Sequence, residues 1–166
     1  QIEAFDRDGY IIVRNALDAE TVSNLIEAGD RIFASDIERN RQNPANLLYD
    51  AYRNCIDMDD AFIPLLAHPT IFPLVVQLLG GNLHLITSHL IYKRPDPAGT
   101  QPTVRDPHWH RDYGIANRDM GNDAASRIIL KCAYYLTDLS EPNSGATLVS
   151  PGSNHLSTAL DIPDGE

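Results

Sequence analysis

The sequence has few cysteines and no long apolar run. Its two cysteines, Cys55 and Cys132, do not form a Cys-x-x-Cys pair, so neither a disulfide scaffold nor a structural zinc site is expected. Scarce cysteine also favours a reducing, cytoplasmic location. The longest apolar stretch, residues 74–79, is interrupted by Gln77 and is far shorter than the roughly 20 residues that cross a bilayer. We therefore expect no membrane-spanning segment.

Positive charge is scarce as well. The 166 residues include 13 Lys and Arg against 23 Asp and Glu, which gives a formal net charge of −10 at pH 7. This excess of negative charge disfavours nucleic acids and anionic membrane surfaces as partners, because both are negatively charged themselves. Hydrophobic residues make up 43% of the chain, which is enough for the buried core of one domain.

Several common catalytic and ligand-binding motifs are missing. No Gly-x-Ser-x-Gly segment of a serine hydrolase occurs, and Gly80-Gly81 is not followed by the Lys-Ser/Thr of a phosphate-binding loop. The acidic residues at 57–60 lack the central glycine and closing glutamate of a calcium loop, so a solvated helix start is the better interpretation.

The pattern of apolar residues changes near residue 80. Upstream, Asp18 can cap a helix with apolar residues at nearly a 3.6-residue period. Those residues are Val22, Leu25, Ile26, Ile32 and Phe33. A second helix is predicted from about Thr70 to Leu79, with Pro73 in its first turn and Gly80-Gly81 at its end. Residues 1–80 are thus predicted to be helical.

Downstream of residue 80 the runs become short and β-like. They cover residues 83–92, 109–113, 128–136 and 146–149, separated by Pro, Gly, Asn and Asp. No crossover helix separates them, which favours a double-sheet jelly roll over a parallel α/β sheet. We therefore predict one mainly β domain over residues 1–166, with helices in 1–80 and the first part of a cupin-like jelly roll in 81–166.

The segment 106–112 combines two histidines with two aspartates. On a strand, alternation would place His108, His110 and Asp112 on one face, with neighbouring members roughly 6 to 7 Å apart. A His-x-Asp pair together with a distant histidine can form the face of ligands that binds non-haem Fe(II) and leaves positions open. The pair alone is a weak indication, and a solvated loop is the alternative.

Five segments together resemble the phytanoyl-CoA hydroxylase family of Fe(II)- and 2-oxoglutarate-dependent dioxygenases. They are Phe5-x-x-x-Gly9-Tyr-Ile-Ile-Val13, Leu90-Ile-Tyr-Lys93-Arg-Pro95, Trp109-His110-Arg-Asp112, Cys132-Ala-Tyr134 through Leu139, and Asn143 through Ser153. Each is common, but five in this order are specific. The resemblance implies a double-stranded β-helix, a jelly roll, with Fe(II), 2-oxoglutarate and O₂ as cofactor and cosubstrates.

The resemblance also implies roles for individual residues. His110 and Asp112 match the first two iron ligands of the family. Tyr134 matches an aromatic residue beside 2-oxoglutarate, with ordinary strand packing as the alternative. Lys93 and His89 share a strand face that the family uses around the cosubstrate carboxylates, with an exposed lysine as the alternative. His108 is expected to be a neighbour of the site rather than a ligand.

The sequence departs from the family in two ways. The family's usual Pro-Gly-Ser-His is replaced by Pro151-Gly-Ser-Asn154-His155, with one extra residue before the histidine. The family's third iron ligand, a histidine, and an arginine that pairs with the far carboxylate of 2-oxoglutarate are both expected beyond residue 166. We therefore predict that residues 1–166 are part of a longer protein. The alternative is that His155 itself completes the metal site.

These features predict an oxygenase that acts on a small organic molecule. The resemblance implies hydroxylation as the usual result, while ring closure, desaturation and epimerisation stay open, and Asp112 disfavours halogenation because halogenating relatives have a small residue there. A neutral or cationic natural product is the preferred substrate, in secondary metabolism such as antibiotic synthesis. A non-catalytic jelly-roll binding module and a cupin-like metalloenzyme that needs no 2-oxoglutarate are the alternatives. The residues give no indication of the oligomeric state.

Overall fold

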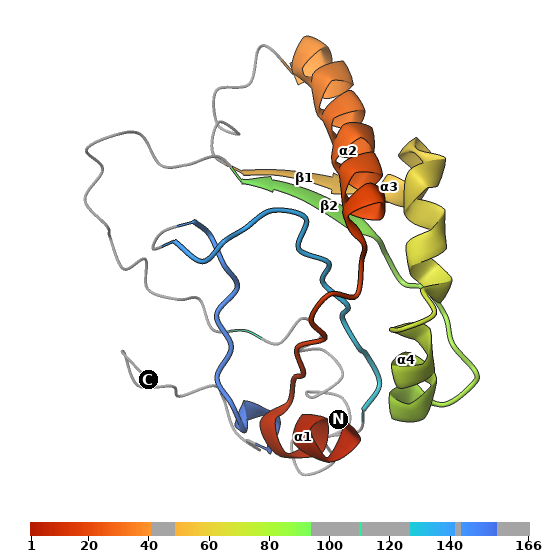
Figure 1. The fold of residues 1–166 in the computed structure, drawn as a ribbon, viewed down its shortest axis with the longest axis vertical. Coiled ribbons are helices and arrows are strands. Elements are labelled where there is room, and N and C mark those ends of the chain that lie inside the picture. The colour runs from red at the N-terminus through yellow and green to blue at the C-terminus, as the bar shows by residue number, and fades with distance from the viewer. Residues whose placement is uncertain (41–48, 94–109, 111–126, 142–143, 156–166) are drawn as a thin grey trace.

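The computed structural model describes residues 1–40, 49–93, 110, 127–141 and 144–155 (Figure 1). Four α-helices, two strands and two 3₁₀ helices lie in these ranges. In chain order they are α1 (Ile2–Asp8), α2 (Ala19–Asn40), β1 (Tyr49–Arg53), α3 (Cys55–Met58), η2 (Asp60–Ala67), α4 (Phe72–Leu79), β2 (His89–Lys93) and η3 (Ser153–His155).

Helix α2 is the helix predicted after Asp18. The Asp18 carboxylate accepts a hydrogen bond from the backbone N–H of Thr21 at 2.7 Å, which satisfies one of the free donors at the helix start. Leu25, Ala28 and Ile32 are buried at spacings of three and four residues. The predicted cap and apolar face are both confirmed.

Strands β1 and β2 pair antiparallel beneath α2 (Figure 1). The register pairs Tyr49 with Lys93, Asp50 with Tyr92, Ala51 with Ile91, Tyr52 with Leu90, and Arg53 with His89. Tyr52 and Leu90 are buried, and the Tyr92 ring stacks on Phe33 of α2 with 4.7 Å between centroids. A Cβ atom at Gly29 would lie 3.3 Å from the Tyr92 hydroxyl, so this glycine allows the close approach of helix and sheet.

The hydrophobic core lies where α2, the sheet, α3 and η2 meet. Its buried members are Leu25, Ala28, Ile32, Tyr52, Cys55, Phe62 and Leu90. Leu25 is the largest fully buried side chain among the described residues. One face of the two-stranded sheet is therefore fixed against the core, and on the other face the described side chains of Arg53, His89 and Ile91 are exposed.

The helix predicted from about Thr70 to Leu79 is observed as α4. It begins two residues late, at Phe72, with Pro73 in its first turn. It ends at Gly80, whose φ of 87° and ψ of 179° are essentially restricted to glycine. No described helix alone is long and apolar enough to cross a membrane; η2 and α4 meet the length and composition criteria only as a pair, across a 53° bend.

The β-like runs predicted downstream of residue 80 are only partly observed. β2 lies inside the predicted run 83–92, whereas 128–136 and 146–149 form no β-ladder with any described residue. Apart from His110, the run 109–113 lies outside the described residues. An alternating sequence suits a strand, but a strand needs a hydrogen-bonded partner, and the described residues supply none for these runs. The described part therefore contains a two-stranded sheet and not a jelly roll.

The acidic residues at 57–60 do start a helix, as predicted. Asp59 caps η2, because its carboxylate accepts a hydrogen bond from the Ala61 N–H at 3.0 Å. The same carboxylate accepts a second bond from the Arg31 guanidinium at 2.7 Å, which connects η2 to α2. Together these bonds hold the pKa of Asp59 below its usual value, the backbone bond being the larger cause.

We expect Asp59→Asn to reduce the acid sensitivity of the fold. A lowered pKa in the folded state stabilises the protein above the usual pKa of an aspartate, and this contribution is lost as pH falls through the folded-state pKa. Asparagine keeps the cap but removes the titrating charge. Unfolding monitored between about pH 7 and pH 2 should show the wild-type advantage over Asp59→Asn shrinking as pH falls. An advantage independent of pH would contradict this role.

Candidate functional site

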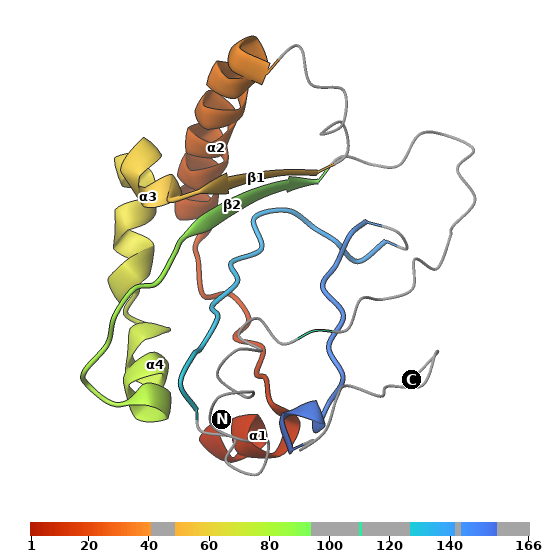
Figure 2. The same cartoon turned by 180° about the vertical axis from the view of Figure 1, so that it is seen from behind.

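The sheet face opposite α2 is the first part of the candidate site. Because Tyr52 and Leu90 point into the core, alternation places Arg53, His89 and Ile91 on the other face. These three side chains are exposed. Figure 2, seen from behind, shows the two strands in front of α2.

Positions 89 and 93 share this second face of the sheet, as the sequence predicted. Lys93 is paired with Tyr49 and follows His89 by four residues on β2. Their proposed role around the cosubstrate carboxylates stays a prediction. Arg53, directly opposite His89, was not identified from the sequence, because the prediction that residues 1–80 are helical was wrong for β1.

Of the two iron ligands that the resemblance implies, His110 and Asp112, His110 lies in the described part of the chain. Its side chain is exposed, and the residue itself is in neither a helix nor a strand. Asp112 and His108 lie outside the described residues, and within the described ranges no group of three His, Cys, Asp or Glu side chains is close enough to hold a metal ion. An imidazole with a neighbouring carboxylate is a donor set that suits Fe(II). The assignment of both ligands stays a prediction.

Tyr134 has a structural partner in the described part of the chain. Its hydroxyl donates a hydrogen bond to the Leu65 carbonyl of η2 at 3.1 Å, and its ring meets His68 edge-on at 6.2 Å between centroids. Partial burial raises the pKa of the hydroxyl to about 12, so it stays protonated and able to donate near neutral pH. This contact accords with the packing alternative; a place beside 2-oxoglutarate stays a prediction.

Tyr134→Phe separates the two roles of this residue. If the hydroxyl serves the fold, its loss should lower the free energy of unfolding by about 1 kcal/mol, because the Leu65 carbonyl loses a partner. The affinity for 2-oxoglutarate should then be unchanged. Chemical denaturation and a 2-oxoglutarate titration measure the two quantities. Weaker 2-oxoglutarate binding at unchanged stability would place the hydroxyl at the cosubstrate instead.

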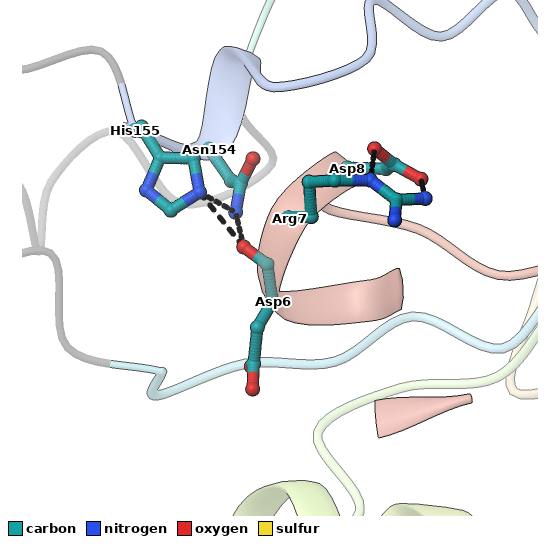
Figure 3. A network of polar contacts seen from close by, with 5 residues as sticks. All are labelled: Asp6, Arg7, Asp8, Asn154 and His155. Atoms are coloured by element: carbon teal, nitrogen blue, oxygen red, sulfur yellow. Dashed lines mark hydrogen bonds and ion pairs between the residues drawn. The ribbon is translucent and has the colours of Figure 1, made fainter. Parts of the chain in front are cut away.

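The turn that contains His155 closes over the end of α1 (Figure 3). His155 Nε2 and Asn154 Nδ2 both lie within hydrogen-bonding distance of the Asp6 carbonyl oxygen, at 2.7 and 3.0 Å. The Gly152 N–H donates to the Asp8 carbonyl at 2.9 Å. The last carbonyls of a helix have no partner inside the helix, so this turn caps α1 from a distant part of the sequence.

The contact with Asp6 also bears on whether His155 could complete the metal site. A carbonyl oxygen only accepts, so Nε2 carries the hydrogen, and Nδ1 is the one ring nitrogen left with a lone pair for a metal. The residue that departs from the family pattern, Asn154, shares the same acceptor. These contacts favour a structural role for His155 over the alternative in which it binds iron.

The glycine of the first motif, Gly9, has a clear structural role at the end of α1. Its φ is 83°, and its N–H donates to the Phe5 carbonyl at 2.8 Å, which ends α1. A Cβ atom at this position would lie 2.9 Å from Asn154 Oδ1. Arg127 also contacts α1. It forms an ion pair with Asp6, and its guanidinium lies 5.7 Å from the centre of the Phe5 ring.

Comparison with known proteins places these motifs in a family. The model of the family "Phytanoyl-CoA dioxygenase (PhyH)" matches residues 5–164. The ectoine dioxygenase of Stutzerimonas stutzeri (strain A1501) is 26% identical over 165 residues, covering 92% of this chain and 49% of the relative. The ectoine dioxygenase of Nocardia farcinica (strain IFM 10152) is 27% identical over 162 residues, covering 93% of this chain and 50% of the relative.

A third relative has another named activity. The L-proline trans-4-hydroxylase of Streptomyces griseoviridis is 24% identical over 157 residues, covering 95% of this chain and 55% of the relative. No solved structure shows significant similarity. The chain spans about half the length of the curated relatives it matches. Since the family model matches almost all of the 166 residues, the chain belongs to the phytanoyl-CoA dioxygenase (PhyH) family.

Proposed function

We propose that the protein is an Fe(II)- and 2-oxoglutarate-dependent oxygenase that oxidises a small organic molecule. The observation that carries this proposal is the family match over residues 5–164. Dioxygenases of this family, such as ectoine dioxygenase, use Fe(II), 2-oxoglutarate and O₂. The three relatives are named for reactions on ectoine and L-proline, which are both small molecules.

In this proposal His110 and Asp112 hold the iron, and a histidine outside residues 1–166 supplies the third ligand. Bound iron together with 2-oxoglutarate and O₂ would supply an oxidant for unreactive C–H bonds. Lys93 offers a positive charge and three donors to a carboxylate of the cosubstrate, and it is held in register by the pairing of β2 with β1. The core under β1 and β2 keeps this face rigid, which precise positioning requires.

Hydroxylation is the proposed outcome, since one relative is named a hydroxylase. The small size of proline supports a small substrate, neutral or cationic overall, in keeping with the net charge of −10. We place the reaction in the tailoring of a secondary metabolite, and Asp112 disfavours halogenation. This setting and the cytoplasmic location stay predictions.

An anaerobic titration of the whole protein tests the proposal. Fe(II) is added first and 2-oxoglutarate second, and the visible charge-transfer band of the chelate is followed. Formation of the band, followed in air by succinate production that ectoine or L-proline stimulates, would support the oxygenase. Iron binding without the band would favour the cupin-like metalloenzyme. Absence of iron binding would favour the non-catalytic binding module.

A further inference from the structure

The sheet face that carries Arg53 and His89 holds basic residues and no acidic one. By register it holds positions 49, 51, 53, 89, 91 and 93, which are Tyr, Ala, Arg, His, Ile and Lys. None of these is acidic, although Asp and Glu outnumber Lys and Arg by 23 to 13 in the chain. The one acidic residue of the strands, Asp50, pairs with Tyr92 and so belongs to the opposite face.

Three other arginines of the described region form ion pairs, whereas Arg53 forms none with a described residue. Arg7 pairs with Asp8, Arg31 with Asp59, and Arg127 with Asp6. Arg53 has no carboxylate partner among the described residues, and its side chain is exposed. In an acidic protein this leaves a guanidinium, with its fork of donors, open to an external anion.

The backbone around Arg53 is well fixed. Tyr52 before it and Cys55 after it are both buried in the core. Asn54 has a φ of 59°, and its N–H donates to the Ser88 carbonyl at 2.6 Å, next to the start of β2. A charged side chain on so constrained a backbone can bind a ligand with little further loss of backbone entropy, so that the entropy cost is that of ordering the side chain.

We propose that Arg53, with His89 opposite it, binds a carboxylate of a small ligand. The proposal rests on the proposed function, because two carboxylate sources follow from it: 2-oxoglutarate and the organic substrate. A planar guanidinium fits a carboxylate through two parallel hydrogen bonds, and the neighbouring imidazole can donate a third.

The spacing along β2 separates this anion position from the one assigned to Lys93. Four residues of a strand extend roughly 13 Å, so His89 and Lys93 stand at well separated backbone positions on this face. Between them lies the Ala51–Ile91 pair, which is apolar. The face thus offers two positions for anionic groups, separated by an apolar residue pair. This arrangement suits one ligand with two carboxylates and an apolar middle, or two ligands bound side by side.

The test uses Arg53→Gln and Arg53→Lys in the whole protein. Arg14→Gln is the matched control, since Arg14 is also exposed and lies outside the sheet. One arm measures 2-oxoglutarate affinity anaerobically in the presence of Fe(II), by the charge-transfer band. The other arm measures the concentrations of L-proline and of ectoine that stimulate succinate formation. Thermal unfolding of each variant checks that the fold is intact.

We expect Arg53→Gln to weaken either 2-oxoglutarate binding or the response to L-proline and ectoine by about 10- to 100-fold. This is the effect of losing a bidentate charged contact. Arg53→Lys should lose less, because it keeps the charge without the fork, and Arg14→Gln should match the wild type. A loss in the first arm assigns the cosubstrate carboxylate, and a loss in the second assigns the substrate carboxylate. If Arg53→Gln matches the wild-type protein in both measurements, the Arg53 proposal alone is overturned. If the wild-type protein itself binds no 2-oxoglutarate, the proposed function is overturned and the Arg53 proposal with it.

Discussion

His110→Ala is expected to lower 2-oxoglutarate turnover by more than about 100-fold, because even groups that only orient a metal ligand are worth 10- to 100-fold. The fold should be almost unaffected. The His110 side chain is exposed, and substitutions at exposed positions change the free energy of unfolding by about 0.5 kcal/mol or less. Succinate formation, bound iron and thermal unfolding measure the three quantities on one sample. Asp112→Ala should behave in the same way.

His84→Ala is the matched control for this prediction. His84 is an exposed histidine in the segment before β2 and has no role in the proposed site. Its replacement should leave iron content and turnover at the wild-type level. Iron content and turnover retained in His110→Ala would contradict the ligand assignment, whereas equal losses in both variants would show a general effect of removing histidines.

The helices were the more predictable part of the fold. Asp18 and Gly80 mark helix ends through local chemistry, a side-chain cap and a backbone angle essentially restricted to glycine, so neighbouring residues are enough to locate them. The seven-residue α1 lies in the part predicted to be helical, but its bounds were not predicted, since it has no side-chain cap and its last carbonyls are satisfied by the turn at 152–155. Such a contact between distant segments leaves no local pattern.

The strands and the site depend on pairing, which the sequence alone does not specify. β1 is only five residues long and was missed, and with it the position of Arg53 opposite His89. The run 128–136 has the composition of a strand but no described partner. By contrast, His110 and Asp112 could be proposed as ligands because the segment Trp109-His110-Arg-Asp112 resembles a motif of the family, whereas their spacing alone was a weak indication. The role of His155 became apparent only from its contact with Asp6.

Gly9→Ala is expected to destabilise the protein by about 2–5 kcal/mol, the sum of two separate costs. A side chain at a φ of 83° costs about 1–2 kcal/mol. The new Cβ atom would also lie 2.9 Å from Asn154 Oδ1 and 3.0 Å from Asn154 Cβ, so α1 or the turn at 152–155 must move. Chemical denaturation of the whole protein measures the total, and hydrogen exchange of α1 shows whether the loss is local.

Two further variants separate the two costs. Gly81→Ala is the control, because nothing lies within 4 Å of a Cβ atom there, and we expect a change of no more than about 0.5 kcal/mol. Asn154→Gly removes the atoms that Gly9→Ala would meet, so in the double variant the penalty of the alanine should fall to the backbone cost alone. An unchanged penalty in the double variant would mean that Asn154 does not press on Gly9. A reduced penalty would show that the extra residue before His155 packs against the first glycine of the chain, which connects the two motifs most distant in the sequence.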